Sequence, residues 1–195
     1  MSAVAVDRAL AAQLLAHWWS RPVPEEVAVW RGGWLDAADT ARSLGCCGAD
    51  LVPLAAALDD EAELLAEYER LFVGPGRVPC PPYEALWRDD GKRLEQGRLM
   101  SAATGSVTRL YRSLDLAVRR DAHELPDHLV VELEALAYAL GEDEQAADEL
   151  LDEHLLRWVP KLSATVEREA ELEFYRLLAR LTPTWLAAIA EPGSQ

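Results

Sequence analysis

The residue types that dominate this chain leave little room for β-structure. Its 195 residues include 32 Ala and 32 Leu, against 14 Val, 6 Thr and one Ile. Ala and Leu are among the strongest helix formers, whereas strands are rich in β-branched and aromatic residues. The length suits one domain with a buried core. We therefore expect an all-α fold over residues 1–195, a single-domain helical bundle of about nine to ten helices.

Acidic residues outnumber basic ones along the whole chain. The net charge of −15 divides into −7 over residues 1–97 and −8 over residues 98–195. Nucleic-acid binding needs a clustered basic surface, and an acidic surface repels anionic lipid. No uncharged stretch approaches the ~20 residues of a membrane span, and the start of the chain predicts an amphipathic helix rather than a signal peptide. We therefore expect a cytoplasmic protein with no nucleic-acid partner and no stable membrane insertion.

Hydrophobic spacing, proline and glycine divide the chain into helices. Apolar residues recur at helical spacing over residues 61–73 and predict an amphipathic helix there. We expect Gly141 to follow the end of a helix, Pro160 to begin a long helix and Pro183 to end it. The other helices are expected over residues 4–19, 24–45, 51–58, 98–116, 126–140 and 144–158, with a short last helix ending at residue 190.

One segment of the chain cannot be helical. Gly74–Tyr83, here called the proline segment, contains four prolines and two glycines in ten residues. Each proline pushes the residue before it into an extended conformation, so the segment should be a stiff connection rather than a flexible linker. An ordered loop on a helical scaffold is a common place for function. We therefore expect one proline-rich ordered loop, and we expect it to take part in the functional site.

The sequence contains no familiar catalytic or cofactor-binding motif. It has no glycine-rich phosphate loop, no G-x-S-x-G and no H-E-x-x-H. Its histidines and cysteines also lack the spacing of a metal site. These residues are His17, His123, His128, His154, Cys46, Cys47 and Cys80. The sequence therefore predicts neither a metal nor another cofactor, and favours a protein that is not an enzyme.

Five motifs, taken in order along the chain, resemble the TorD/DmsD/NarJ family of redox-enzyme maturation chaperones. They are Tyr68-x-x-Leu71-Phe72, Gly74-Pro75-Gly76, Pro81-Pro82-Tyr83-Glu84, Pro126-Asp127-His128-Leu129-x-x-Glu132-Leu133 and His154-Leu155-x-x-Trp158-x-Pro160. The resemblance covers residues 60–182, whereas the N-terminal helices of residues 1–58 match only in length and helicity. Two positions depart from the family pattern: Ala85 replaces the usual serine, and Trp87 the commoner tyrosine.

The resemblance implies an all-helical cytoplasmic chaperone. Such a protein binds the twin-arginine signal peptide, or the N-terminal region, of a molybdopterin oxidoreductase catalytic subunit, and delays its export until the cofactor is inserted and the subunit has folded. The peptide-binding positions that the resemblance implies are Tyr68, Leu71, Phe72, Pro82, Tyr83, Glu84, Asp127 and His128. Among these, Glu84 and Asp127 are suited to pair with arginines through two hydrogen bonds each. Both a monomer and a domain-swapped dimer are compatible with this interpretation.

Two other functions stay open at this point. A nitrate-reductase-type assembly chaperone would help insert the molybdenum cofactor into a client that is not exported. A small thiol-dependent enzyme would use Cys80 with His128. Taken alone, the spacing of Glu67–Phe72 is also that of an ordinary core-facing helix, and Asp127 and His128 suit a helix cap.

Overall fold

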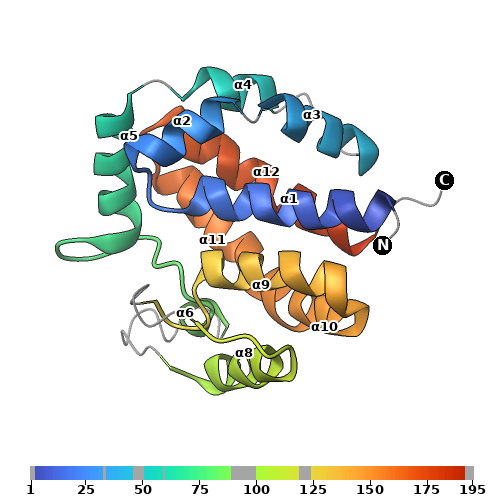
Figure 1. The fold of residues 1–195 in the computed structure, drawn as a ribbon. Helices are drawn as coiled ribbons and strands as arrows, with labels where there is room; N and C mark the ends of the chain where they lie inside the picture. The colour runs from blue at the N-terminus through green and yellow to red at the C-terminus, as the bar shows by residue number, and fades with distance from the viewer. Residues whose placement is uncertain are drawn as a thin grey trace.

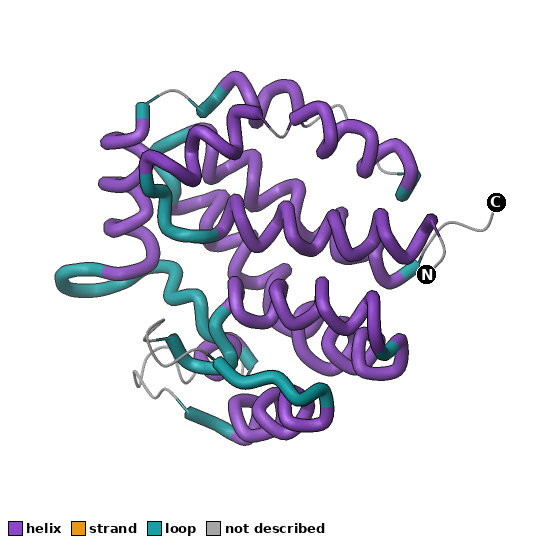
Figure 2. Tube along the Cα trace, in the orientation of Figure 1, coloured by secondary structure: helices purple, strands orange, loops and turns teal. Residues whose placement is uncertain are grey.

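The computed structural model describes residues 3–32, 34–45, 51–58, 60–88, 100–118 and 124–191. Cys46, Cys47, His123 and the expected helix start at residue 98 lie outside these ranges. Figures 1 and 2 show the arrangement of the elements. The helices are α1 (Ala3–Trp19), α2 (Pro24–Gly32), α3 (Trp34–Ser43), α4 (Leu51–Ala56), α5 (Glu61–Tyr68), α6 (Glu84–Trp87), α8 (Ala102–Ser113), α9 (Leu129–Glu142), α10 (Glu144–Glu149), α11 (Leu156–Glu169) and α12 (Glu173–Ala190). Two π-helical segments complete them, η2 (Glu69–Val73) and η3 (Leu150–Leu155).

The expected all-α fold is confirmed. Since η2 continues α5, and η3 joins α10 to α11 without a break, the described ranges form ten continuous helices and contain no strand. The amphipathic helix over residues 61–73 is present, and the proline segment that follows it is not helical. None of the helices in these ranges combines the length and apolar character that crossing a bilayer requires.

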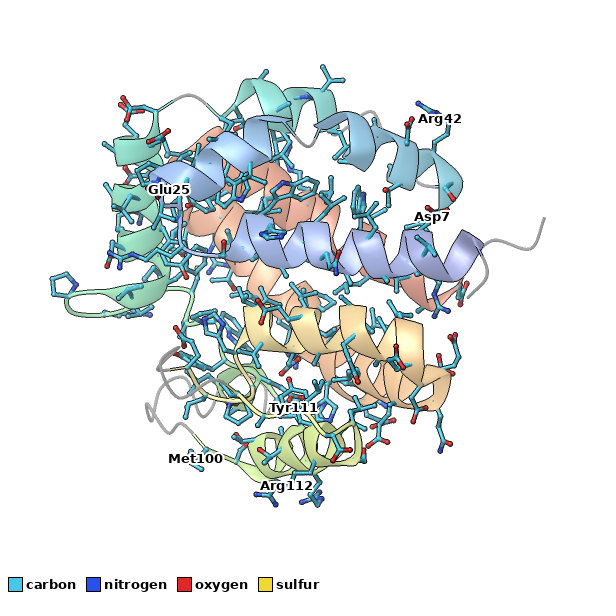
Figure 3. All side chains as sticks on the ribbon, viewed as in Figure 1. Asp7, Glu25, Arg42, Met100, Tyr111 and Arg112 are labelled. Atoms are coloured by element: carbon cyan, nitrogen blue, oxygen red, sulfur yellow. The ribbon has the colours of Figure 1, made fainter. Side chains whose placement is uncertain are left out.

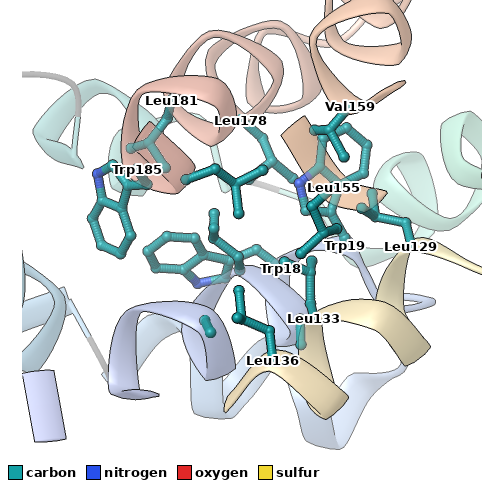
Figure 4. Packing of buried hydrophobic residues seen from close by; sticks show 14 of the residues in the cluster. Trp18, Trp19, Leu129, Leu133, Leu136, Leu155, Val159, Leu178, Leu181 and Trp185 are labelled. Atoms are coloured by element: carbon teal, nitrogen blue, oxygen red, sulfur yellow. The ribbon is translucent and has the colours of Figure 1, made fainter. Parts of the chain in front are cut away.

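The centre of the molecule is a layer of aromatic and aliphatic side chains between α1, α9, α11 and α12. α1 packs most extensively against α9, and α11 against α12. Trp18 of α1 and Trp185 of α12 lie with their ring centroids 5.6 Å apart, and both are buried. Figure 4 shows them beside Leu133 and Leu178. Burying a large apolar side chain stabilises a fold by about 1.5–3 kcal/mol, so this layer holds the first helix against the last two.

Charged side chains project from the periphery instead. Figure 3 shows Arg42 at the edge of the molecule, pointing away from α3, and both Arg42 and Glu25 are exposed. The buried hydrophobic cluster includes residues of α1–α4, of the motif-bearing helices α5, α9 and α11, and of α12. The N-terminal helices therefore share a core with the segment that resembles the family.

Three expected helix boundaries are wrong. Gly141 lies inside α9, which ends at Glu142, and Asp143 then caps α10 by accepting a hydrogen bond from the Ala146 N–H at 3.1 Å. Pro160 lies inside α11 and Pro183 inside α12. A proline within a helix costs about 3 kcal/mol. The buried side chains on both sides of each proline, among them those of Trp158 and Trp185, offset that cost.

The helix break falls instead between Glu169 and Glu173. The carboxylate of Glu67 on α5 accepts hydrogen bonds from the backbone N–H groups of Glu171 at 2.5 Å and Leu172 at 3.4 Å. It also accepts two from the Arg70 guanidinium. The buried carboxylate thus ends α11 and begins α12 from another part of the chain. These hydrogen bonds outweigh the effect of burial and lower the pKa of Glu67.

Candidate functional site

Backbone hydrogen bonds join the proline segment to the turn before α9. Tyr83 and His128 form an isolated antiparallel bridge. In it the Glu84 N–H donates to the Asp127 carbonyl, and the Leu129 N–H donates to the Pro82 carbonyl, both at 2.9 Å. Farther back, the Cys80 N–H donates to the Leu71 carbonyl at 3.0 Å. Two motifs more than 40 residues apart in the chain therefore form one rigid unit.

Asp127 holds this unit together from inside. Its side chain has no exposed surface, and its Oδ2 accepts hydrogen bonds from the Ala85 N–H at 3.0 Å and the Thr104 hydroxyl at 3.1 Å. Burial raises the pKa of Asp127, although these two hydrogen bonds act in the opposite direction. Asp127 thus caps the short helix α6 and ties it to α8.

His128 is the N-cap of α9. Its Nδ1 accepts a hydrogen bond from the Val130 N–H at 3.2 Å, so the neutral ring carries its proton on Nε2. That Nε2 lies 3.8 Å from a carboxylate oxygen of Glu124. Burial lowers the pKa of His128 and outweighs the attraction of Glu124 for the protonated ring. The His128 ring also packs edge-on against Tyr83, with 5.2 Å between the ring centroids.

A cleft of about 460 Å³ opens where the proline segment, η2 and the turn before α9 meet. Its lining is largely apolar and aromatic, with one acid and one arginine. The residues that line it are Tyr68, Phe72, Val73, Arg77, Val78, Pro81, Pro82, Tyr83, Leu86, Glu124 and His128. The Tyr83 hydroxyl donates to Glu124 at 2.9 Å, which fixes the acid at the edge of the aromatic wall. Such a cleft suits an extended ligand with an apolar stretch and a cationic group.

The π-helical turn η2 shapes one wall of the cleft. Phe72 and Val73 of this turn line the cleft, whereas Leu71, which has no exposed surface, does not. Phe72 packs edge-on against Trp19 and lies 5.1 Å, centroid to centroid, from Tyr68. Single π-turns within helices are frequent at functional sites. Here the turn joins the cleft to the aromatic core.

The eight residues singled out in the sequence separate into two groups. Five line the cleft: Tyr68, Phe72, Pro82, Tyr83 and His128. The other three, Leu71, Glu84 and Asp127, are fully buried and do not line it. In this conformation neither Glu84 nor Asp127 presents an oxygen to a ligand in the cleft, because their carboxylates face interior partners.

The charged residues of the cleft are ones that sequence reasoning missed. Glu124 is the acidic residue of the lining and Arg77 is the basic one. The apolar wall is extended by Val73, Val78, Pro81 and Leu86. Glu124 lies four residues before His128, and that spacing was the available signal. Arg77 stands inside the proline segment, where its position relative to η2 depends on how the loop folds back.

A second group of motif residues meets beneath the cleft. The Glu84 carboxylate on α6 lies 2.8 Å from Nδ1 of His154 on η3. Glu132 of α9 accepts a hydrogen bond from the Trp158 indole N–H at 3.1 Å. Glu84, Glu132 and His154 are all buried. Burial first, and then the negative charge of Glu84, raise the pKa of Glu132 well above its ordinary value.

The structure is thus that of a helical protein with a largely apolar cleft beside the proline segment. A family model described as nitrate reductase delta subunit matches residues 43–164. The chain therefore belongs to this family, which includes the TorD, DmsD and NarJ chaperones.

Individual relatives agree with this assignment. The chain is 31% identical over 121 residues to the chaperone protein TorD of Actinobacillus succinogenes, a match that covers 61% of this chain and 59% of that protein. It is 28% identical over 141 residues to the Tat proofreading chaperone DmsD of Salmonella typhi, covering 70% of this chain and 66% of DmsD. The match spans between 59% and 74% of the length of the TorD relatives.

The fold also has a solved counterpart. A crystal structure described as that of a redox enzyme maturation protein from Archaeoglobus fulgidus aligns with a TM-score of 0.63 and covers 92% of this chain and 93% of that one. The sequence identity is 24%, so this likeness concerns the fold alone.

Proposed function

We propose that this chain is a chaperone that binds the twin-arginine signal peptide, or the N-terminal region, of a molybdopterin-containing oxidoreductase catalytic subunit. In this role it delays export until the cofactor is inserted and the subunit has folded. The observation that carries the proposal is the cleft, in which an aromatic wall stands next to a single acid. The names of the TorD and DmsD relatives support the same role.

The charges in the cleft give the bound peptide a direction. The paired arginines lie at Glu124, because a carboxylate accepts hydrogen bonds from a guanidinium group. The apolar stretch of the peptide packs on Tyr68, Phe72 and Leu86. Arg77 repels further cations and keeps the arginines at the Glu124 side. The stiff proline segment lowers the entropy lost on binding, because its wall needs little reordering.

The eight candidate residues take two roles in this proposal. The five that line the cleft contact the peptide. Leu71, Glu84 and Asp127 instead position those five, because they hold η2, α6 and the turn before α9 in place. Glu124 takes over the recognition of arginine that the sequence favoured for Glu84 and Asp127.

A titration with synthetic peptides tests this function. One peptide carries two adjacent arginines followed by an apolar stretch, and its matched control replaces both arginines with glutamine. We expect one peptide to bind per chain with a dissociation constant on the order of micromolar, which is about −8 kcal/mol, and the control to bind at least about tenfold more weakly. Equal binding of the two peptides would contradict the proposed recognition.

The family model favours one alternative. Its description as a nitrate reductase delta subunit supports an assembly chaperone that aids molybdenum-cofactor insertion into a client that is not exported. The groove is the same in this case, but the client's N-terminus carries no pair of arginines. Co-purification of the full chain with its client, followed by sequencing of the client's N-terminus, separates the two functions.

We also propose that the chain is not an enzyme and acts in the cytoplasm, as a monomer or a domain-swapped dimer. A thiol-dependent mechanism has little support. Cys80 is fully buried, and burial raises the pKa of its thiol to about 12, which leaves almost no thiolate at neutral pH. Reaction of the native chain with a thiol reagent at pH 7 should therefore leave Cys80 unmodified.

A further inference from the structure

Three polar side chains from distant parts of the chain meet in the interior beneath the cleft. Glu84 comes from α6, Glu132 from α9 and His154 from η3. Both carboxylates have no exposed surface, and His154 is 2% exposed. One donor atom from each of the three residues lies within 4.8 Å of the other two. This separation is short enough for a single ion to contact all three.

Arg88 brings one positive charge to the edge of this cluster. Arg88 approaches Glu84 Oε1 at 3.4 Å, but the same guanidinium nitrogen also donates to the Glu153 carbonyl at 2.7 Å. Around Glu132, the Trp158 indole donates one neutral hydrogen bond, and Asp127 adds negative charge nearby. Burying ionised carboxylates is unfavourable by several kcal/mol each unless a cation or a proton neutralises them. The cluster therefore needs positive charge beyond that of Arg88.

With both carboxyls ionised, each of the three residues also keeps one buried atom that has no hydrogen-bond partner among the described residues. These atoms are Glu84 Oε1, Glu132 Oε1 and His154 Nε2. The 2.8 Å contact joins Nδ1 of His154 to Oε2 of Glu84, and two ligands of one ion lie at a similar separation. An ion held by the Glu84 carboxylate therefore takes the lone pair of Nδ1 and leaves the imidazole proton on Nε2.

We propose that Glu84, Glu132 and His154 bind a divalent transition-metal ion. Two carboxylate oxygens and one imidazole nitrogen suit zinc, manganese or iron(II), whereas magnesium and calcium prefer oxygen ligands alone. All three ligands are buried, so the ion enters as the chain folds and its role is structural. It links α6, α9 and η3 and so steadies the floor of the cleft.

A competing source of positive charge is a proton. A hydrogen bond between the carboxyl groups of Glu84 and Glu132 contributes to the raised pKa of Glu132, so one shared proton leaves the pair with a single negative charge, which Arg88 faces. The two explanations differ in whether a metal is taken up. They also differ in the effect of Glu132→Gln, which abolishes metal binding but replaces a protonated carboxyl with a similar neutral group.

Cobalt(II) is a suitable probe because its visible absorption reports ligand geometry. The full chain is unfolded with a chelator, then refolded at pH 7.5 with cobalt(II) in 0.15 M salt and excess magnesium, which occupies exposed carboxylates. We expect one equivalent of cobalt to bind, with d–d absorption bands that zinc displaces. When the free metal concentration is about 100 times the dissociation constant, the Tm should rise by about 5–10 °C.

Amino-acid substitutions test whether these three residues bind the metal. Glu132→Gln and His154→Gln should each remove the cobalt absorption, whereas Glu67→Gln, a change at a buried acid outside the cluster, should keep it. Absence of the absorption and of the Tm rise in the unaltered chain overturns the proposal and leaves the shared proton. Binding that persists unchanged in the two cluster variants overturns it as well, because the cobalt then sits on other carboxylates. The measurement on the unaltered chain decides the question even where a variant fails to fold.

Discussion

The lining of the cleft and the layer beneath it use similar residue types for different purposes. In the lining, Glu124 is partly exposed and holds one hydrogen bond from Tyr83. In the layer beneath, Asp127 has no exposed surface and accepts two hydrogen bonds from α6 and α8. An acid at the lining is available to a ligand, whereas an acid below is already used by the fold. In the proposed function both kinds of residue belong to one site, and the first kind contacts the peptide.

The comparison predicts its largest effect at Asp127. Replacing Asp127 with alanine leaves the Ala85 N–H and the Thr104 hydroxyl buried without an acceptor, so the free energy of unfolding should fall by about 2–4 kcal/mol. Urea denaturation followed by circular dichroism measures it. Asp127→Asn should cost less because its amide oxygen still accepts, and Asp148→Ala, at an exposed acid on α10, should have little effect. Full stability of Asp127→Ala would remove the distinction between the two layers.

Replacing Tyr83 should weaken peptide binding more than it lowers stability. Its ring is half-buried and forms part of the cleft wall, so Tyr83→Ala should weaken binding of the twin-arginine peptide by about tenfold or more while costing less stability than Asp127→Ala. Calorimetric titration gives the affinity and urea denaturation gives the stability. Tyr138→Ala is the matched control, because Tyr138 is 44% exposed on α9 outside this cleft. If Tyr83→Ala and Tyr138→Ala bound the peptide equally well, the peptide would not occupy this cleft.

A smaller effect of pH should come from His128, which lines the cleft and also caps α9. Burial lowers the pKa of His128, so the unfolded chain binds a proton more readily than the folded chain. The resulting contribution to stability is fully present above the ordinary value of 6.5 and is lost as the pH falls toward the lowered pKa. The variant His128→Asn keeps a cap for α9 but does not titrate.

Urea denaturation at pH 7.5 and pH 5 measures this contribution as the difference between the two chains. The unaltered chain should lose more stability on acidification than His128→Asn, while the raised pKa values of Asp127 and Glu132 affect both chains alike. An identical loss in the two chains would mean that burial of His128 does not control its protonation.

Local sequence features account for much of the fold. The apolar spacing of residues 61–73 and the prolines of Gly74–Tyr83 act over a few residues, and both elements are present as expected. A proline disfavours the helix locally, so local patterns predict helix boundaries at Pro160 and Pro183. Their helices continue because large side chains on either side are buried by distant helices, and the real break depends on Glu67, about 100 residues away.

The site shows the same limit more clearly. The motifs lie in segments that the structure brings together around the cleft, but residue type alone does not separate residues that line the cleft from residues that support it. Asp127 and Glu84 were expected to read arginines, yet their partners, Ala85 and His154, lie 42 and 70 residues away in the chain. Glu124 was missed because its proximity to Tyr83 depends on the bridge between Tyr83 and His128. Contacts of that range are not visible in local spacing.

A double-mutant cycle tests the central claim most directly. Glu124→Gln is combined with a peptide in which the paired arginines are replaced by glutamine, and the four affinities are measured by calorimetric titration. Glutamine still accepts the hydrogen bond from Tyr83, so the cleft wall is kept. The matched control is Glu149→Gln, a change at an exposed acid on α10.

We expect a coupling energy of about 1–2 kcal/mol between Glu124 and the arginines, within the range measured for residues that interact directly. The control Glu149→Gln should show no coupling. A coupling near zero at Glu124 while both single changes weaken binding, or an equal coupling at Glu149, would contradict the claim that the acid in the cleft lining reads the arginines.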